Sequence, residues 1–193
     1  MIAYGIEAVL GELVKLLIFT TIGILFNCMI EIIVLVISYG ILRASTGGPH
    51  CSSYLRCLLL GIMTFTPLAI LAARATTTSL AIAVIVSVLL AAYAIFKYVP
   101  GEWHQRKLKK PKEVYQNAAI VSIIVLVTIT IMMLLSEQQL FLNIGLAIQL
   151  AIIWQLLSIT PLGYKLILMA DQFMIDFASI LGKGGANDDD IKG

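Results

Sequence analysis

The sequence predicts an all-α membrane protein, a polytopic helical bundle with five or six membrane segments and an amphipathic helix at each end. Of its 193 residues, 60% are hydrophobic and only 12% are charged, whereas soluble globular domains average about 25% charged residues. Several apolar runs approach the ~20 residues that an α-helix needs to cross a bilayer. The net charge of +2 is too small to indicate a nucleic-acid partner. The high apolar content instead predicts the lipid bilayer as the partner.

The first part of the chain, residues 2–17, predicts an amphipathic helix that lies in the membrane interface. Its polar positions, Glu7, Gly11 and Lys15, recur every four residues, and apolar residues occupy the other side. The start of the chain lacks the basic segment and small-residue cleavage site of a secretory signal. We therefore expect this helix to remain part of the folded protein.

Longer apolar runs follow at residues 16–42, 57–71, 80–98, 118–135 and 141–162. Counted strictly, they give five crossings and an external N-terminus, whereas a sixth crossing would need a short re-entrant segment within residues 9–42. The first run carries Asn27 and Glu31, one helical turn apart on one face. An acid inside a span normally faces other helices. We expect Glu31 to fix helix packing through a hydrogen bond or, alternatively, to contact the polar segment that follows.

The C-terminal part predicts a second amphipathic helix at residues 163–182, with Lys165, Gln172, Asp176 and Ser179 on one face. The last residues, 183–193, are rich in glycine and acidic residues and predict a disordered tail. The sequence has no internal repeat, so residues 1–182 are expected to form a single transmembrane domain.

Basic residues indicate the orientation of the bundle. The lysine-rich segment, residues 97–113, contains Lys97, Arg106, Lys107, Lys109, Lys110 and Lys112 against only Glu102 and Glu113. The positive-inside rule places this segment in the cytoplasm. A second polar break, residues 43–57, is flanked by Arg43 and Arg56, and two spans separate it from the lysine-rich segment. Both segments are therefore expected on the cytoplasmic side of the cell membrane.

Residues 43–57, which we call the reactive segment, carry one histidine and two cysteines within a short polar stretch. A cysteine nucleophile reacts as its thiolate, and a nearby imidazole is the usual base that produces it. Cys57 follows His50 by seven residues, a rise of about 10 Å in one straight helix, which exceeds the ~3 Å of a direct contact. The pair can therefore act together only if His50 precedes the helix. The turn-forming Gly47-Gly48-Pro49, and Ser52 or Ser53 as an N-cap, predict that arrangement.

Other readings of the reactive groups remain open from the residues alone. An ordinary cytoplasmic turn with buried cysteines has the same composition. The three cysteines, at positions 28, 51 and 57, are an odd number and give no disulfide framework. The second histidine, His104, has no acid or cysteine at ligand spacing, and no His-Glu-x-x-His motif is present. The sequence therefore predicts no metal site and no cofactor.

The reactive segment resembles the accessory gene regulator protein B (AgrB) family of membrane cysteine endopeptidases. The resemblance covers nearly the whole chain, because its length, its spans and the order of its polar blocks also agree. The matching residues are Arg43, Gly47-Gly48-Pro49-His50, Ser52, Ser53, Cys57 and, at the end of a later span, Tyr98-Val99-Pro100 and Pro111.

The resemblance implies proteolytic maturation of an AgrD-type precursor peptide in Gram-positive quorum sensing. His50 would be the base or ion-pair partner of Cys57, the nucleophile, and the precursor's own cysteine or serine would then close a thiolactone or lactone ring. Arg43 and Gly48 would support the geometry of the site. Lys107, Lys109 and Lys110 would attract the acidic end of the precursor.

Two other functions remain as alternatives. A peptidase of the same chemistry could act on another cyclic peptide, such as a bacteriocin-like one. A non-catalytic peptide transporter could use Asn143, Gln149 and Gln155 to line a path, although polar groups of this kind more often join helices. The sequence also leaves open whether the chain acts alone or as a homodimer.

Overall fold

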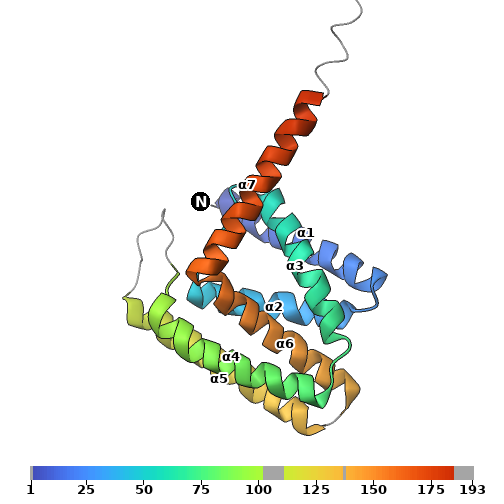
Figure 1. The fold of residues 1–193 in the computed structure, drawn as a ribbon, viewed down its shortest axis with the longest axis vertical. Coiled ribbons are helices and arrows are strands. Elements are labelled where there is room, and N and C mark those ends of the chain that lie inside the picture. Colours follow the sequence, from blue (N-terminus) through green and yellow to red (C-terminus); the bar gives the residue numbers. More distant parts are fainter. Residues whose placement is uncertain (1, 102–110, 137, 185–193) are drawn as a thin grey trace, which may run out of the picture.

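The computed structural model describes residues 2–101, 111–136 and 138–184. Within these ranges the chain forms helices only: α1 (Ile2–Leu25), α2 (Met29–Thr46), α3 (Tyr54–Ala72), α4 (Thr77–Tyr98), α5 (Lys112–Ser136), α6 (Gln139–Ser158) and α7 (Pro161–Gly184) (Figure 1). Five of them, α2 to α6, are long and apolar enough to cross a membrane. The predicted all-α membrane bundle is confirmed.

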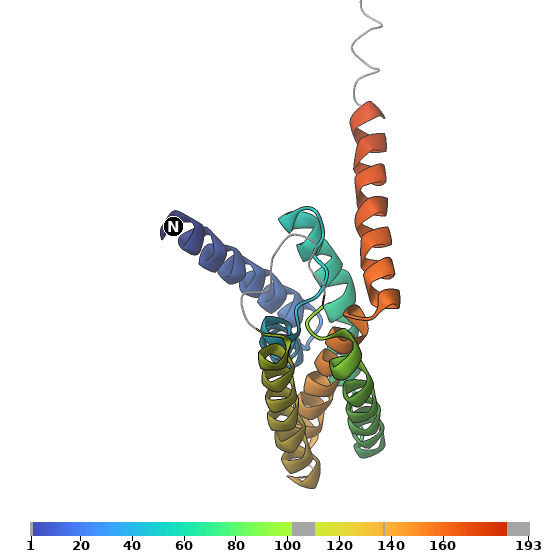
Figure 2. The same ribbon diagram turned by 90° about the vertical axis from the view of Figure 1, so that its left-hand side faces the viewer.

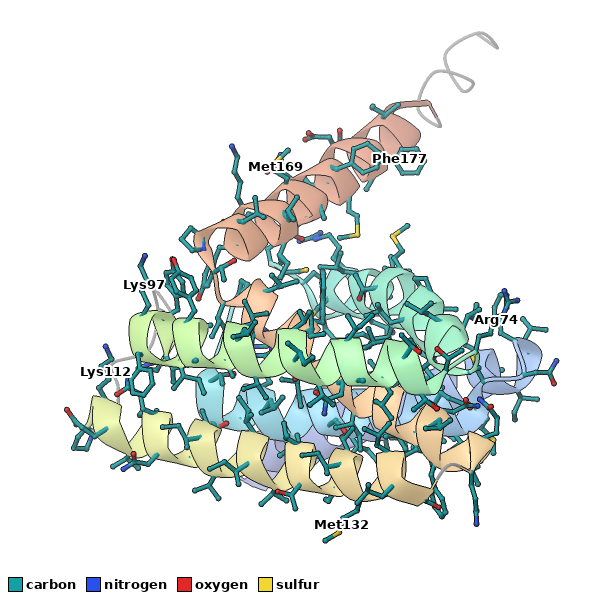
Figure 3. The ribbon with its side chains drawn as sticks, turned by 60° about the horizontal axis from the view of Figure 1, so that its bottom comes forward. Arg74, Lys97, Lys112, Met132, Met169 and Phe177 are labelled. Atoms are coloured by element: carbon teal, nitrogen blue, oxygen red, sulfur yellow. The ribbon has the colours of Figure 1, made fainter. Side chains whose placement is uncertain are left out.

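The surface of the bundle is that of a protein surrounded by lipid. Along α4 and α5 many large apolar side chains point outward, among them Leu89, Phe96 and Met132, each about two-thirds exposed. Lys97 and Lys112 lie at one end of these helices and Arg74 lies at the other (Figure 3). An apolar belt between charged ends is the arrangement expected for membrane-spanning helices.

The central element of the bundle is α6, which contacts α2, α3, α4, α5 and α7. Gln149 on α6 is fully buried; its amide donates to Thr130 on α5 (2.9 Å), and its carbonyl accepts from Ser87 on α4. An unpaired polar group inside a bilayer costs several kcal/mol, and here both ends of the amide are paired. Gln149 therefore joins three helices, the more common of the two roles expected for it.

The N-terminal region differs from the sequence prediction. One helix, α1, continues to Leu25, the chain turns at residues 26–28, and α2 begins at Met29, so neither the helix at 2–17 nor the run at 16–42 is a separate element. Asn27 adopts a left-handed backbone conformation (φ 54°), which asparagine tolerates better than most residues. Asn27 therefore does not share a helix face with Glu31. A single asparagine in an apolar run was too weak a signal to reveal this turn.

The turn folds α1 back against α2 as a helical hairpin. Near the turn, a methyl group added to Gly23 would come within 2.6 Å of the Met29 Cα, so the two backbones are in close contact. Near the other end, the Tyr54 hydroxyl at the start of α3 donates to the Gly11 carbonyl. The middle of α1, around Gly11, thus lies beside the reactive segment. The apolar part of α1, Leu13–Leu25, is shorter than the five spans, in agreement with the alternative of a short additional segment within residues 9–42.

Glu31, near the start of α2, is buried and accepts a hydrogen bond from the Asn143 amide of α6 (3.0 Å). It lies at the opposite end of α2 from Arg43, because three helical turns separate the two residues. This contact agrees with the expectation that Glu31 fixes helix packing. It does not agree with the alternative, in which Glu31 contacts the reactive segment.

The C-terminal helix α7 confirms the amphipathic helix predicted at 163–182, with slightly wider bounds. It leaves the bundle as a projecting rod (Figure 2). Between residues 161 and 180 a narrow stripe, Gly163, Ile167 and Asp171, is buried, while Leu166, Phe173, Phe177 and Ile180 are more than half exposed. The predicted tail lies almost entirely outside the described residues.

Candidate active site

The chain leaves α2 through two glycines, as Gly47-Gly48-Pro49 predicted. Gly47 (φ 74°) caps the helix, its N–H donating to the Arg43 carbonyl at 3.0 Å, and Gly48 (φ 135°) follows. Both backbone conformations favour glycine because a Cβ atom would be strained there. The glycines turn the chain away from the α2 axis, so that Pro49, His50 and Cys51 lie outside any helix.

Helix α3 begins only at Tyr54, which confirms that His50 precedes the helix. Ser53 stands at the N-cap in an extended conformation, and the Cys57 N–H makes the first helical hydrogen bond, to the Ser53 carbonyl at 3.0 Å. The Ser53 hydroxyl caps no backbone N–H. The predicted position of the N-cap is therefore correct, but the Ser53 side chain does not stabilise the start of the helix by a capping hydrogen bond.

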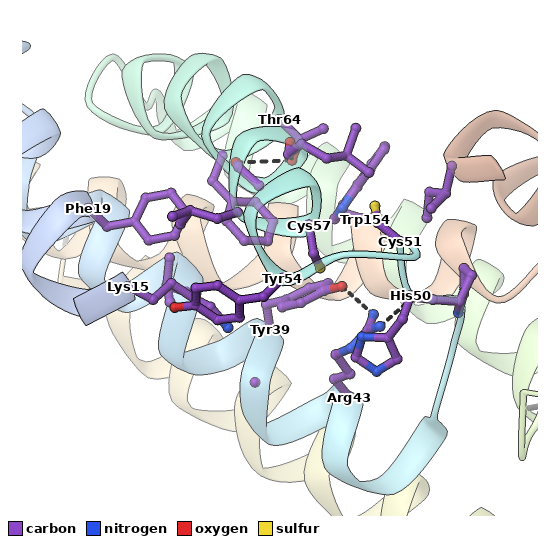
Figure 4. Close-up of a pocket in the computed structure, with 18 of the residues that line it drawn as sticks. Lys15, Phe19, Tyr39, Arg43, His50, Cys51, Tyr54, Cys57, Thr64 and Trp154 are labelled. Atoms are coloured by element: carbon purple, nitrogen blue, oxygen red, sulfur yellow. Dashed lines mark hydrogen bonds between the residues drawn. The ribbon is translucent and has the colours of Figure 1, made fainter. Parts of the chain in front are cut away.

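Arg43, His50, Cys51 and Cys57 all line one pocket of about 600 Å³, so the sequence-predicted groups come together (Figure 4). Figure 4 shows Arg43 and His50 on one side of this pocket and Phe19 and Lys15 on the other. His50 is exposed, and both cysteines are partly buried. The rest of the wall is largely apolar and includes Phe65, Trp154 and Ile167.

Arg43 holds the chain just before His50. Its guanidinium donates to the Pro49 carbonyl and to the Tyr39 hydroxyl (2.5 Å), and it lies 5.5 Å from the centre of the Tyr39 ring. The direction of the Pro49 carbonyl determines where the next residue begins. Arg43 therefore orients the backbone that carries the imidazole. Gly48, the other expected support residue, lies beside it: a methyl group there would be 3.5 Å from an Arg43 nitrogen.

Cys51 and Cys57 differ in their surroundings. Burial, the neighbouring Cys57 sulfur and the Asp171 carboxylate together raise the pKa of Cys51 from 9.0 to about 11, and the Arg56 guanidinium opposes them only weakly. Cys51 is therefore a neutral thiol near pH 7 and a poor nucleophile. The raised pKa argues against Cys51 as the nucleophile, and Cys57 as the nucleophile stays a prediction.

Asp171 of α7, which the sequence analysis did not single out, contacts the reactive segment directly. Its carboxylate accepts from the Ser52 N–H (2.9 Å), the Ser52 hydroxyl (2.6 Å) and the Arg56 Nε (2.8 Å). Burial alone would raise the pKa of Asp171, but these hydrogen bonds and the Arg56 charge outweigh burial and lower it. The sequence did contain a signal, because Asp171 lies about 100° away from the polar face formed by Gln172 and Asp176.

The reactive segment also contacts the chain that enters the lysine-rich segment. The Gly101 N–H donates to the Thr46 carbonyl at 2.8 Å, and Gly47 and Gly101 form an isolated parallel bridge. Gln155 of α6 supports this junction by donating to the Thr46 hydroxyl (2.6 Å) and the Gly47 carbonyl (2.7 Å). Lys107, Lys109 and Lys110, like His104, lie outside the described residues. The sequence did not predict the contact between the two segments.

Among the described residues, no group of three or more His, Cys, Asp or Glu side chains could hold a metal ion. What the site does contain is a thiol pair, an exposed imidazole and a fixed guanidinium around an apolar pocket. These groups suit nucleophilic chemistry on a carbonyl carbon.

Comparisons with known proteins agree with the resemblance of the reactive segment. A family model described as Accessory gene regulator B matches residues 1–159. Two AgrB-like proteins of Clostridium perfringens are 26% identical (strain SM101, over 188 residues) and 22% identical (strain 13, over 184 residues); each match covers 90% of this chain and 86% of the relative. No solved structure gives a significant match. Because the family model covers the reactive segment and all five apolar spans, the chain belongs to the accessory gene regulator B (AgrB) family.

Proposed function

We propose that this protein is a membrane-embedded cysteine endopeptidase that cleaves an AgrD-type precursor peptide and assists its cyclisation. The observation that carries the proposal is the late start of α3 at Tyr54, which leaves His50 in the loop and brings it to the same pocket as Cys57. Membership of a peptidase family supports the same conclusion.

The reaction assigns His50 and Cys57 complementary roles. The imidazole takes the proton from the Cys57 sulfur, and the thiolate attacks the carbonyl carbon between the future signal peptide and the acidic C-terminal segment of the precursor. As the C–N bond breaks, the imidazolium gives its proton to the leaving amine. The signal half of the precursor is then joined to Cys57 as a thioester.

The second half of the reaction closes the ring. The precursor's own thiol or hydroxyl attacks the thioester carbonyl, loses its proton to the imidazole, and expels the Cys57 sulfur, which is reprotonated. Water competes with this attack and would give a linear product. The apolar wall of the pocket, including Phe65 and Trp154, supports the exclusion of water from the thioester.

Arg43 and Gly48 act as supports of the site in this proposal. Arg43 orients the backbone in front of His50 through the Pro49 carbonyl. Gly48 provides a conformation that a residue with a Cβ atom would strain to adopt.

The acidic end of the precursor is proposed to bind the lysine-rich segment through Lys107, Lys109 and Lys110. Opposite charges attract and favour encounter. The contact between Gly47 and Gly101 supports the proposal, because it holds the first residues of the lysine-rich segment beside the reactive segment. Changing the three lysines together to glutamate should abolish processing; unchanged processing would refute this part of the proposal.

The proposed location is the cell membrane, with the active site on the cytoplasmic side. Lys97 and Lys112 lie at the same end of the bundle as Gly101 and the reactive segment, and the positive-inside rule favours the cytoplasm for that end.

The test uses the full chain in proteoliposomes with the short, acid-ended peptide encoded beside it. Cys57→Ala should abolish cleavage and remove a covalent peptide adduct that mass spectrometry detects at Cys57, and His50→Ala should lower the cleavage rate by about 10²–10⁴-fold. Cys51→Ala is the matched control and should keep activity. Cleavage that survives Cys57→Ala would overturn the proposal.

The same variants separate the alternatives. A non-catalytic transporter would keep working after Cys57→Ala, and the buried, fully paired amide of Gln149 gives it no support as a peptide path. A peptidase for a different cyclic peptide would need Cys57 but ignore the neighbouring acid-ended peptide.

A further inference from the structure

A buried carboxylate connects the projecting helix α7 to the reactive segment. Asp171 is 6% exposed, and its two oxygens accept from Ser52 and from Arg56. Arg56 in turn donates to the Ser52 hydroxyl at 2.5 Å, which closes a ring of hydrogen bonds among the three residues.

We propose that Asp171 is a positioning residue for the peptidase: it fixes the loop after His50 to the first turn of α3 and so holds the imidazole at the pocket that Cys57 lines. The inference rests on the proposed function of these two residues. It assigns a role to α7, which begins after the region that the family model matches.

The residues that Asp171 contacts lie within the stretch of chain between His50 and Cys57. Ser52 stands two residues after His50, and Arg56 stands one residue before Cys57. A carboxylate bonded to both residues sets the distance and direction between the loop and the first turn of α3. On the other side of His50, Arg43 holds the Pro49 carbonyl. His50 and Cys51 thus lie between two charged anchors, one from α2 and one from α7.

Asp171 also stabilises the N-terminus of α3, which the residues next to it in the sequence do not cap. The Ser53 hydroxyl does not cap α3, and a helix start is stabilised by a nearby negative charge. Asp171 supplies that charge from 115 residues further along the chain than Arg56. The start of α3, and with it the position of Cys57, therefore depends on α7 being in place.

In this proposal Asp171 affects the two cysteines by different routes, its charge acting on Cys51 and its bonds to the loop acting on Cys57. This gives a readout that a simple tie between helices would not give. The carboxylate is one of the causes that raise the pKa of Cys51. Removing the charge while keeping the shape should make Cys51 more reactive, whereas displacement of the His50 imidazole should make Cys57 less reactive.

The experiment alkylates the full-length protein in proteoliposomes with iodoacetamide and measures the rate at each cysteine by peptide mass spectrometry, so it needs no precursor. Asp171→Asn should slow Cys57 by at least about tenfold, to the level of His50→Ala, and should accelerate Cys51. Asp171→Glu should restore part of the Cys57 rate. The matched control is Asp176→Asn on the same helix, where the exposed carboxylate bonds only Gln172 among the recorded side-chain contacts; it should leave both rates unchanged.

The outcomes are distinct. If His50→Ala slows Cys57 and Asp171→Asn does not, Asp171 has no positioning role, while the proposed function stands. If both cysteines are alkylated faster in Asp171→Asn, α7 merely covers the site and the inference is wrong.

If His50→Ala itself leaves the alkylation rate of Cys57 unchanged, the proposed function fails first. Should Asp171→Asn not fold, Ser52→Ala removes the hydroxyl bonded to Asp171 and Arg56 but keeps the carboxylate charge. It must then slow Cys57 without accelerating Cys51, and an unchanged Cys57 rate overturns the proposal.

Discussion

At the scale of single residues, two thiols six positions apart meet at one pocket but occupy different electrostatic surroundings. Cys51 lies near the Asp171 carboxylate and is kept neutral. Cys57 begins the hydrogen-bonded part of α3. Burial is the largest cause of the raised pKa of Cys51, the Cys57 sulfur comes second, and the Asp171 carboxylate of α7 adds to them.

The reactivity of Cys51 should depend on pH in a way that its raised pKa determines. A pKa of about 11 instead of 9.0 leaves about a hundredfold less thiolate at pH 8. Alkylation of Cys51 should therefore be about a hundredfold slower than that of a free thiol at pH 8 and should rise until about pH 11. Because the folded state holds this proton more tightly than the unfolded state, stability should fall as pH rises from about 9 to 11. Rapid alkylation of Cys51 at pH 8 would contradict the assignment.

A methyl group at Gly48 should damage the site. With φ at 135°, alanine there is strained by about 1–3 kcal/mol, and its methyl group would contact the Arg43 guanidinium. Gly48→Ala should lower both the melting temperature in detergent and the peptidase rate. The control for stability is Gly40→Ala, where nothing lies within 4 Å of the added methyl; it should raise stability slightly, by about 0.5–1 kcal/mol. A Gly48→Ala protein as stable as the Gly40→Ala protein would contradict the prediction.

At the scale of elements, α6 organises the bundle through its amides. Gln149 connects α6 to α4 and α5, and Gln155 connects it to the end of α2 and to the reactive segment. In a bilayer, where apolar surfaces have no water to leave, such bonds and close packing hold helices together. The same helix therefore supports both the core and the backbone that carries His50.

Removing the amide of Gln149 should loosen the three-helix contact. Gln149→Ala leaves the Ser87 and Thr130 hydroxyls without this partner, at a cost of about 1–2 kcal/mol. Thermal unfolding in detergent should show a lower melting temperature. Asn117→Ala, at an exposed position on α5, is the control and should change little. An equal melting temperature for both variants would show that the amide is not a structural link.

At the scale of the whole molecule, the bundle has a reactive end and an opposite end. The reactive segment, Gly101 and the middle of α1 around Gly11 lie at one end, whereas the turns at residues 26–28 and before Gln138 lie at the far end of the helices. Helix α7 leaves from the reactive end (Figure 1). The hairpin of α1 and α2 thus determines on which side the chain begins.

This arrangement predicts the topology in cells. In a background without the native cysteines, an impermeant maleimide added to intact cells should label Gln138→Cys and should not label Lys112→Cys. A peptide tag placed before α1 should be detected only after permeabilisation, like Lys112→Cys. A tag that is accessible together with Gln138→Cys would show that α1 does not fold back as described.

Local residues could predict only part of this structure. The break before α3 was predictable because Gly47, Gly48 and Pro49 act on their own backbone. The turn at Asn27 was not predictable, because one polar residue in an apolar run also fits a continuous span. Asp171 was not predictable as a partner of Ser52, because pairing across 119 residues is set by packing rather than by sequence spacing. The roles of Lys107, Lys109 and Lys110 stay predictions.

The junction between α6 and α7 consists of only two residues, Ile159 and Thr160. The family match ends at this junction, so a chimera that joined residues 1–159 to the C-terminal helix of a different relative would keep the thiol, the imidazole and the guanidinium. It would still lack the carboxylate that accepts hydrogen bonds from Ser52 and Arg56, unless the grafted helix carried an acid at the position equivalent to Asp171. In this proposal the functional unit therefore extends one helix beyond the residues that the family model matches.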